Sequence, residues 1–156
     1  MKDLKERYVA LQKKYKLPSF EELNNEFELL SLPALEEIPK PLSFIRRRIN
    51  DRIAWACNLI QIIIQPNPGS FITMYESGLF DKIEKNKMSQ LLKELMILER
   101  ESLCIDVDGT EEQDVQYILT VTKVWPQHKK ELRKIGETLK QGWREERKAV
   151  QSSYLG

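Results

Sequence analysis

The most informative hydrophobic pattern of the chain lies in residues 42–65, between prolines at 39 and 41 and prolines at 66 and 68. At about 100° per residue, its polar residues fall in one narrow strip of a helical wheel, and isoleucines and other apolar residues fill the remaining circumference. A helix with so narrow a polar strip must be covered on most sides. The pattern therefore predicts a long buried helix at the centre of a helical core, or one that contributes to a subunit interface.

Amphipathic spacing and capping residues predict further helices on both sides of this segment. Two short helices are expected within residues 1–30, a short helix in 71–78, and longer helices after residues 81 and 110. The expected helix starts carry capping boxes, in which an N-cap side chain and a residue three positions on exchange hydrogen bonds. These boxes are Ser19 with Glu22, Asp81 with Glu84, and Thr110 with Gln113. Pro126 is expected to stop or kink the helix that contains it, with helical spacing resuming from residue 127.

These elements predict an all-α fold, a single-domain helical bundle of about six helices around the long central buried helix at about 42–65. Within one domain of residues 1–156, we expect an N-terminal helical hairpin at 1–30, a proline-containing connector at 31–41 and a helical core at 42–156. Three apolar residues of the connector are expected to hold it against the core: Leu32, Leu35 and Ile38.

Composition adds limits to this picture. A chain of 156 residues with 41% hydrophobic and 31% charged residues suits one globular domain, and its net charge of +1 creates no overall field that would attract nucleic acid or an anionic membrane. Met1 opens directly into a charged helical pattern, and no apolar run approaches the length of about 20 residues that spans a bilayer. Cys57 and Cys104 are expected to be buried thiols. The sequence therefore predicts a cytoplasmic protein with no membrane association.

One short string looks like a catalytic motif. Asp106, Asp108, Gly109 and Thr110 form the sequence DxDGT after apolar residues, which resembles motif I of the haloacid-dehalogenase-like phosphatases. The resemblance implies a nucleophilic first aspartate at the end of a strand, an acid/base second aspartate, magnesium and a parallel sheet. The surrounding residues instead have helical spacing, and no second acidic strand-end motif follows. We therefore interpret the string as a turn between two helices with Thr110 as N-cap, and keep a phosphatase as a remote alternative.

Other catalytic and metal-binding schemes find no support in the residue pattern. The single histidine, His128, is expected in an exposed first helical turn, without an identifiable nucleophile partner. No Cys/His spacing suits zinc, and no glycine-rich phosphate loop is present. We therefore expect no catalytic residues, no cofactor and no metal, and a protein that is not an enzyme.

An arginine cluster in the central helix is the more informative charged feature. Arg46, Arg48 and Arg52 lie near its start, and Arg52 falls on the wheel close to the middle of the apolar arc. A guanidinium on the core side must be paired or must reach solvent. We expect Arg52 to pair with a carboxylate of the acidic second helix, most plausibly Glu22 or Glu26. A contact of these arginines with phosphate or nucleic acid, or with a partner protein, is the alternative.

Four isoleucines near the end of the central helix point in nearly all directions, namely Ile60, Ile62, Ile63 and Ile64. A six-helix monomer offers little surface to cover them all, so they are the candidate interface residues of a homodimer or of a complex with another protein.

The sequence thus predicts a non-catalytic helical interaction or scaffold subunit. The competing hypothesis is a nucleic-acid-associated accessory protein that uses Arg46, Arg48 and Arg52 together with the basic terminal helices. The first sixteen residues and the segment 126–150 each carry a local charge of +4. Aromatic residues are not interleaved with these charges, so any nucleic-acid binding is expected to be weak.

Overall fold

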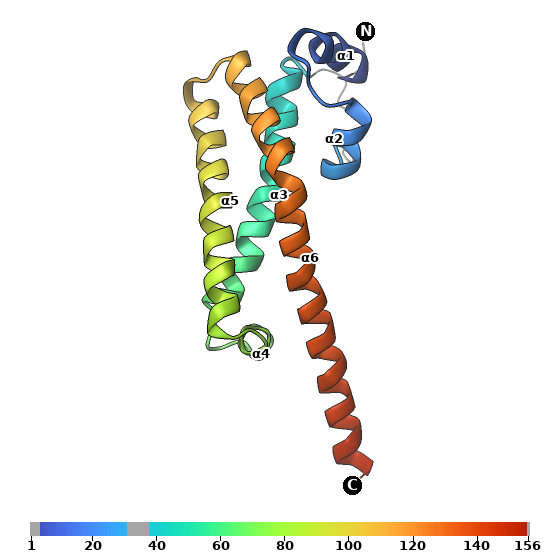
Figure 1. The fold of residues 1–156 in the computed structure, drawn as a ribbon, viewed down its shortest axis with the longest axis vertical. Helices are drawn as coiled ribbons and strands as arrows, with labels where there is room; N and C mark the ends of the chain where they lie inside the picture. The colour runs from blue at the N-terminus through green and yellow to red at the C-terminus, as the bar shows by residue number, and fades with distance from the viewer. Residues whose placement is uncertain (1–3, 31–37, 156) are drawn as a thin grey trace. The chain divides into compact units, whose positions relative to one another are not determined.

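The computed structural model describes residues 4–30 and 38–155, with side chains up to residue 146 (Figure 1). The described residues form six α-helices and no strand, so the predicted all-α fold is confirmed. The helices are α1 (Leu4–Tyr15), α2 (Phe20–Phe27), α3 (Pro41–Ile64), α4 (Phe71–Gly78), α5 (Lys82–Asp108) and α6 (Glu111–Leu155). Leu32 and Leu35 of the predicted connector lie outside the described residues, whereas Ile38 is buried.

Four of these helices begin at the N-cap residues that the sequence predicts. Ser19 and Glu22 form a complete capping box at the start of α2. Two further pairs exchange hydrogen bonds at the starts of α5 and α6, namely Asp81 with Glu84 and Thr110 with Gln113. Ser70 caps α4 by accepting a hydrogen bond from the backbone of Thr73. These side chains satisfy backbone N–H groups that have no partner inside the helix.

Pro126 was expected to stop or kink its helix, and the expected stop is wrong, because α6 runs without a break from Glu111 to Leu155. Proline removes one backbone hydrogen bond, but the turns on either side of it are held by buried side chains. Trp125 precedes the proline and is buried, and so is His128 two residues after it. The expectation that His128 lies exposed in a first helical turn is therefore also wrong.

The chain forms two compact units, and the three long helices contribute to both. The first unit contains residues 1–55 and 94–125. In it, Trp125 packs against Phe27, with ring centroids 5.5 Å apart, and its indole N–H donates to Glu26 over 3.2 Å. The core of this unit is built from apolar side chains of α1, α2, α3, α5 and α6, among them Tyr8, Phe20, Leu23, Ile45, Ile49, Ile53, Leu95, Leu98, Ile118 and Val121.

The second unit contains residues 56–93 and 126–156. It comprises the end of α3, all of α4, the start of α5 and the second part of α6. Its buried apolar residues are Ala56, Cys57, Ile60, Ile63, Phe80, Met88, Leu91, Leu132 and Ile135. Helix α4 is joined to α3 by the hydroxyl of Ser77, which donates to the carbonyl oxygen of Ile63 over 2.6 Å.

Helix α3 is the long central helix that the sequence predicts, but its buried face is narrower than expected. Trp55 and Ile62 were assigned to the covered part of the wheel, yet they are 54% and 48% exposed. The buried residues Ile49, Ile53 and Ile60 lie to one side of them on the helix. An apolar side chain alone does not guarantee a neighbouring element to cover it, so an apolar arc overestimates burial.

None of the helices in residues 4–30 and 38–155 combines the length and the hydropathy of a membrane span.

The two cysteines differ in exposure. Cys57 is buried as predicted, but Cys104 is exposed on α5, because it lies on the side of this helix opposite Leu95 and Leu98. The prediction of two buried thiols therefore holds for Cys57 alone.

Candidate functional site

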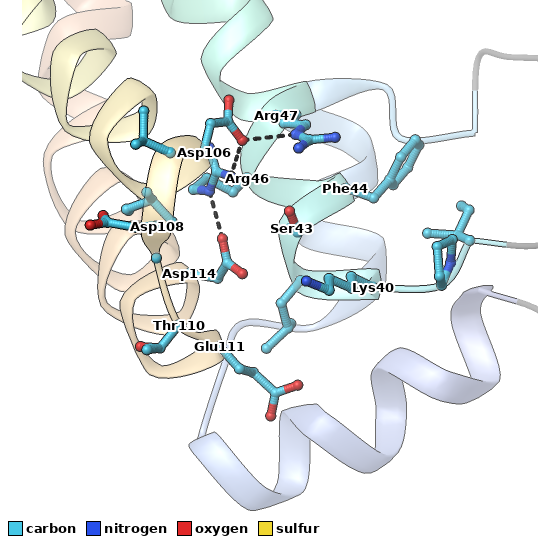
Figure 2. Close-up of a pocket in the computed structure, with 16 residues that line it drawn as sticks. Lys40, Ser43, Phe44, Arg46, Arg47, Asp106, Asp108, Thr110, Glu111 and Asp114 are labelled. Atoms are coloured by element: carbon cyan, nitrogen blue, oxygen red, sulfur yellow. Dashed lines mark hydrogen bonds and ion pairs between the residues drawn. The ribbon is translucent and has the colours of Figure 1, made fainter.

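The main polar site of the first unit is built around Arg46, in the second turn of α3. This side chain is only 1% exposed. Its guanidinium donates from Nε to Asp114 Oδ1 over 2.6 Å and from Nη2 to Asp106 Oδ1 over 2.5 Å. Its Nη1 donates to both the carbonyl oxygen and the hydroxyl of Ser102. One buried arginine therefore links α3 to α5 and α6 (Figure 2).

Pairing outweighs burial in the electrostatics of this cluster. Burial acts to lower the pKa of the Arg46 guanidinium, but its hydrogen bonds to Asp106 and Asp114 together raise that pKa above its usual value. The hydrogen bond from Arg46 is also the main cause that lowers the pKa of Asp106, with a second contribution from Arg47. Arg46 is therefore charged, and Asp106 is a carboxylate well below neutral pH.

A tyrosine extends the polar cluster into the interior of the first unit. Tyr117 on α6 is fully buried, and its hydroxyl donates to Asn50 on α3 over 3.4 Å. Burial raises the pKa of this hydroxyl, so Tyr117 stays protonated and can act as a donor. Polar groups on three helices are thus satisfied by one another, which fixes the register of α3, α5 and α6 in this unit.

A pocket of about 650 Å³ opens beside the cluster. It lies between the start of α3 and the turn that joins α5 to α6 (Figure 2). Its walls combine apolar residues with charged residues of both signs, and the lining includes Lys40, Ser43, Arg46, Arg47, Asp106, Asp108, Glu111 and Asp114. A volume of this size is within the range of small-molecule sites.

The DxDGT string lies at this pocket, but not in the setting of a phosphatase. Asp106 is in the last turn of α5, where both Arg46 and Arg47 bind it. Gly109 is required for packing, because a Cβ there would lie 2.6 Å from the carbonyl oxygen of Ile105. Thr110 is the N-cap of α6. The described residues contain no strand that could carry a nucleophilic aspartate. Asp106 also differs from a simple turn residue, because it is a partner of the buried arginine.

The other arginines of α3 are paired at the surface. Arg48 is 3.3 Å from Asp51 and also donates to the carbonyl oxygen of Glu28. Arg52 forms an ion pair of 3.3 Å with Glu28, the C-cap residue of α2. The pairing of Arg52 with this acidic segment was expected, but Glu28 is the partner that the structure shows, not Glu22 or Glu26.

Glu22 and Glu26 have other roles. Glu22 closes the capping box of α2, and Glu26 accepts from Trp125. The buried arginine is Arg46, a member of the predicted cluster whose burial was not expected. A signal was present, because on the wheel of α3 Arg46 falls between the buried residues Ile53 and Cys57.

The four candidate interface isoleucines do not form one exposed surface. Ile60 and Ile63 are buried, Ile64 is half-buried, and Ile62 is exposed. Other exposed apolar residues lie on α4 and α5, and three of them are close together on the short helix α4, where Phe71 is 68% and Ile72 is 57% exposed. We refer to Phe71, Ile72 and Met74 as the α4 patch. This patch was not predicted, because the sequence pattern of residues 71–78 shows a short helix but not which of its side chains are covered.

Helix α4 is held to the second unit by polar groups. The hydroxyl of Tyr75 donates to the carbonyl oxygen of Gly142 over 2.5 Å, and the indole N–H of Trp143 donates to Glu76 over 3.3 Å. The rings of Tyr75 and Trp143 are 4.6 Å apart, and Phe71 stacks on Tyr75 at 6.0 Å. Tyr75, Glu76 and Ser77 therefore attach α4 to neighbouring segments, while the α4 patch stays exposed.

No family model, curated protein or solved structure matches this chain. Within residues 4–30 and 38–155, no group of three or more histidine, cysteine, aspartate or glutamate side chains is placed to hold a metal ion.

Proposed function

We propose that this protein is a non-catalytic helical interaction subunit that binds another protein, or a second copy of itself, through the α4 patch. The observation that carries the proposal is the exposure of apolar side chains on a helix that is held in place. Tyr75 and Ser77 bond α4 to neighbouring segments, while Phe71 and Ile72 are exposed. Clustered exposed apolar residues with a polar surround are typical of protein interfaces.

Physical magnitudes support binding at this surface. Complete burial of a side chain such as phenylalanine, isoleucine or methionine contributes about 1.5–3 kcal/mol. A side chain that is more than half exposed in the free protein can still gain most of this free energy when a partner covers it. The stacked rings of Phe71, Tyr75 and Trp143 are already ordered by packing and hydrogen bonds. The binding of a partner would therefore cost little conformational entropy of these side chains.

The nucleic-acid hypothesis is the second candidate. Its support is the basic character of the second unit, with twelve Lys/Arg and seven Asp/Glu in residues 56–93 and 126–156. Against it, the arginines of α3 are engaged with carboxylates. Acidic groups also act on the aromatic cluster of α4. The pKa of the Tyr75 hydroxyl is raised mainly by burial and further by the negative charges of Glu146 and Glu145. Carboxylates beside the rings disfavour the approach of phosphates.

Site-specific photocrosslinking in cells tests the proposed function. A photoreactive amino acid at position 72 should give adducts with a protein, and the same residue at position 97 is the matched control. Ile97 is also an exposed isoleucine, 67% exposed, but it belongs to α5 and not to the α4 patch. Protein adducts at position 72 alone support the proposal. Equal adducts at both positions, or none at position 72, contradict it.

The phosphatase alternative has its own test. We expect no magnesium-dependent hydrolysis of a generic phosphomonoester above background, because Asp106 is bound by two arginines in a helix. Hydrolysis that is abolished by Asp106→Asn and kept by Asp51→Asn would contradict the non-catalytic proposal.

A further inference from the structure

The pocket beside Arg46 contains one carboxylate oxygen that is not used by the arginine. The side chain of Asp114 is only 10% exposed, and it binds Arg46 through Oδ1. Among residues 4–30 and 38–146, none donates a hydrogen bond to Oδ2 of Asp114. Figure 2 shows this oxygen directed away from Arg46, toward the side of the pocket where Lys40 lies. An acceptor that opens onto a pocket and is not used by a protein donor is available to a donor of a ligand.

Donors gather on the opposite side of the same pocket. The side chain of Lys40 is directed into it, with the hydroxyl of Ser43 nearby (Figure 2). Lys40 directly precedes α3, which begins at Pro41, and Ser43 lies in its first turn. The first N–H groups of a helix have no partner inside the helix, and the helix dipole favours an anion there. This side of the pocket therefore suits a carboxylate.

Apolar residues form the remaining wall, namely Ile38, Leu42, Phe44, Ile105 and Val107. The charged residues of the lining nearly balance, with Lys40, Arg46 and Arg47 against Asp106, Asp108, Glu111 and Asp114. A simple anion would meet the carboxylates, and a simple cation would meet Lys40. A ligand with both charges satisfies the two sides at once.

We propose that this pocket binds a small zwitterion of the amino-acid type. Its ammonium group binds Asp114 Oδ2, its carboxylate group binds Lys40, Ser43 and the start of α3, and its apolar part lies on the apolar wall. The pocket belongs entirely to the first unit, so this site is independent of the proposed protein interaction.

Three related probes separate the charge requirements. L-leucine carries both charges, leucinamide has only the ammonium group, and 4-methylpentanoate has only the carboxylate. Methyl NMR titration of the whole protein measures binding, with Ile105 and Val107 as reporters in the pocket and Ile63 of the second unit as reference. We expect saturable shifts at the two reporters with L-leucine and at least tenfold weaker binding of either single-charge probe. Comparable affinity for all three, or no saturable shift with L-leucine, overturns the proposal.

Paired variants test the acidic and the basic side of the pocket. Asp114→Asn keeps an oxygen acceptor for Arg46 but removes the negative charge, and Lys40→Met removes the ammonium group without touching the Arg46 cluster. Each is expected to weaken binding of L-leucine about tenfold or more, whereas the exposed-site controls Asp51→Asn and Lys123→Met keep the affinity of the original protein. Circular dichroism shows whether each variant is folded. If Asp114→Asn fails to fold, Lys40→Met decides alone, and unchanged binding in a folded Lys40→Met protein overturns the proposal.

Discussion

At the scale of single residues, two arginines of one helix differ in their surroundings. Arg46 is 1% exposed and binds two aspartates and a serine. Arg52 is 34% exposed, and its partner Glu28 is 66% exposed. Loss of its partners leaves a buried charge without compensation and strongly destabilises the fold. At the surface, water solvates a charge that has lost its partner, so the loss costs little. The two positions therefore provide a matched comparison of buried and surface ion pairs.

Arg46→Met should lower the free energy of unfolding by about 3–5 kcal/mol, because it leaves Asp114 buried without its cation. Arg52→Met should lower it by about 0–1 kcal/mol. Urea denaturation of both variants beside the original protein measures the two losses. Equal losses would contradict the difference in burial on which this prediction rests.

The pH dependence of stability tests Asp106. The hydrogen bond from Arg46, helped by Arg47, lowers the pKa of this carboxyl in the folded protein below its ordinary value of 3.8, and burial opposes the shift only in part. The folded state therefore gains stability above the ordinary pKa, and this gain is lost as the pH falls through the lowered pKa.

Asp106→Asn should accordingly be less stable than the original protein at neutral pH, and the difference should shrink in acid below a pH of about 4. Urea denaturation at a series of pH values measures it. Asp108→Asn, two residues further along the chain, is the control, and its stability should depend on pH as that of the original protein does. A difference that is constant down to the lowest pH would show that the charge of Asp106 does not contribute.

At the scale of helices, local chemistry was more predictable than packing. The capping boxes at Ser19 and Thr110 were predictable, because their partners are only three residues away. The continuity of α6 through Pro126 was not, because it depends on burial of the neighbouring turns. The orientation of α4 was not predictable either, since its polar partners Ile63 and Gly142 lie far along the chain.

Two glycines of α6 test the attachment of α4. Gly136 has open space where a Cβ would be, whereas a Cβ at Gly142 would overlap the side chain of Leu79. Gly136→Ala should therefore raise the free energy of unfolding by about 0.5–1 kcal/mol through helix propensity. Gly142→Ala should lose this gain, because Leu79 must move. Thermal denaturation compares them, and equal stabilisation would mean that the contact at Gly142 is loose.

At the scale of the whole molecule, the all-α fold and the long central helix were predictable from periodicity alone. The helical wheel failed for Trp55 and Ile62, because it reports which faces are apolar and not which faces have a neighbour. The same limit applies to Arg46, whose burial depends on carboxylates of α5 and α6. The pocket could not be predicted, because its walls come from residues far apart in sequence. The exposure of the α4 patch could not be predicted either, because it depends on how α4 is attached to distant residues such as Gly142.

Retention on heparin tests the nucleic-acid hypothesis for the whole chain. With a net charge of +1 and its α3 arginines paired, the protein should bind heparin weakly and elute at low salt. Phosphate-type contacts weaken steeply with salt. Retention that persists above about 0.2 M salt and is lost in Lys129→Gln/Arg133→Gln, but not in Lys82→Gln/Lys85→Gln, would favour the nucleic-acid hypothesis over the protein-interaction proposal.

The attachment of α4 also determines when its surface can exist during synthesis. The hydrogen bond from Tyr75 to Gly142 joins residues 67 positions apart. An eight-residue helix is too short to be stable alone in water, so α4 depends on its contacts with the end of α3 and with the segment around Gly142, and the second set forms only after that segment has emerged. A nascent chain that stops before that point carries the α4 patch without the packing of Trp143 on Tyr75. A partner that recognises the ordered patch would therefore distinguish finished molecules from incomplete ones.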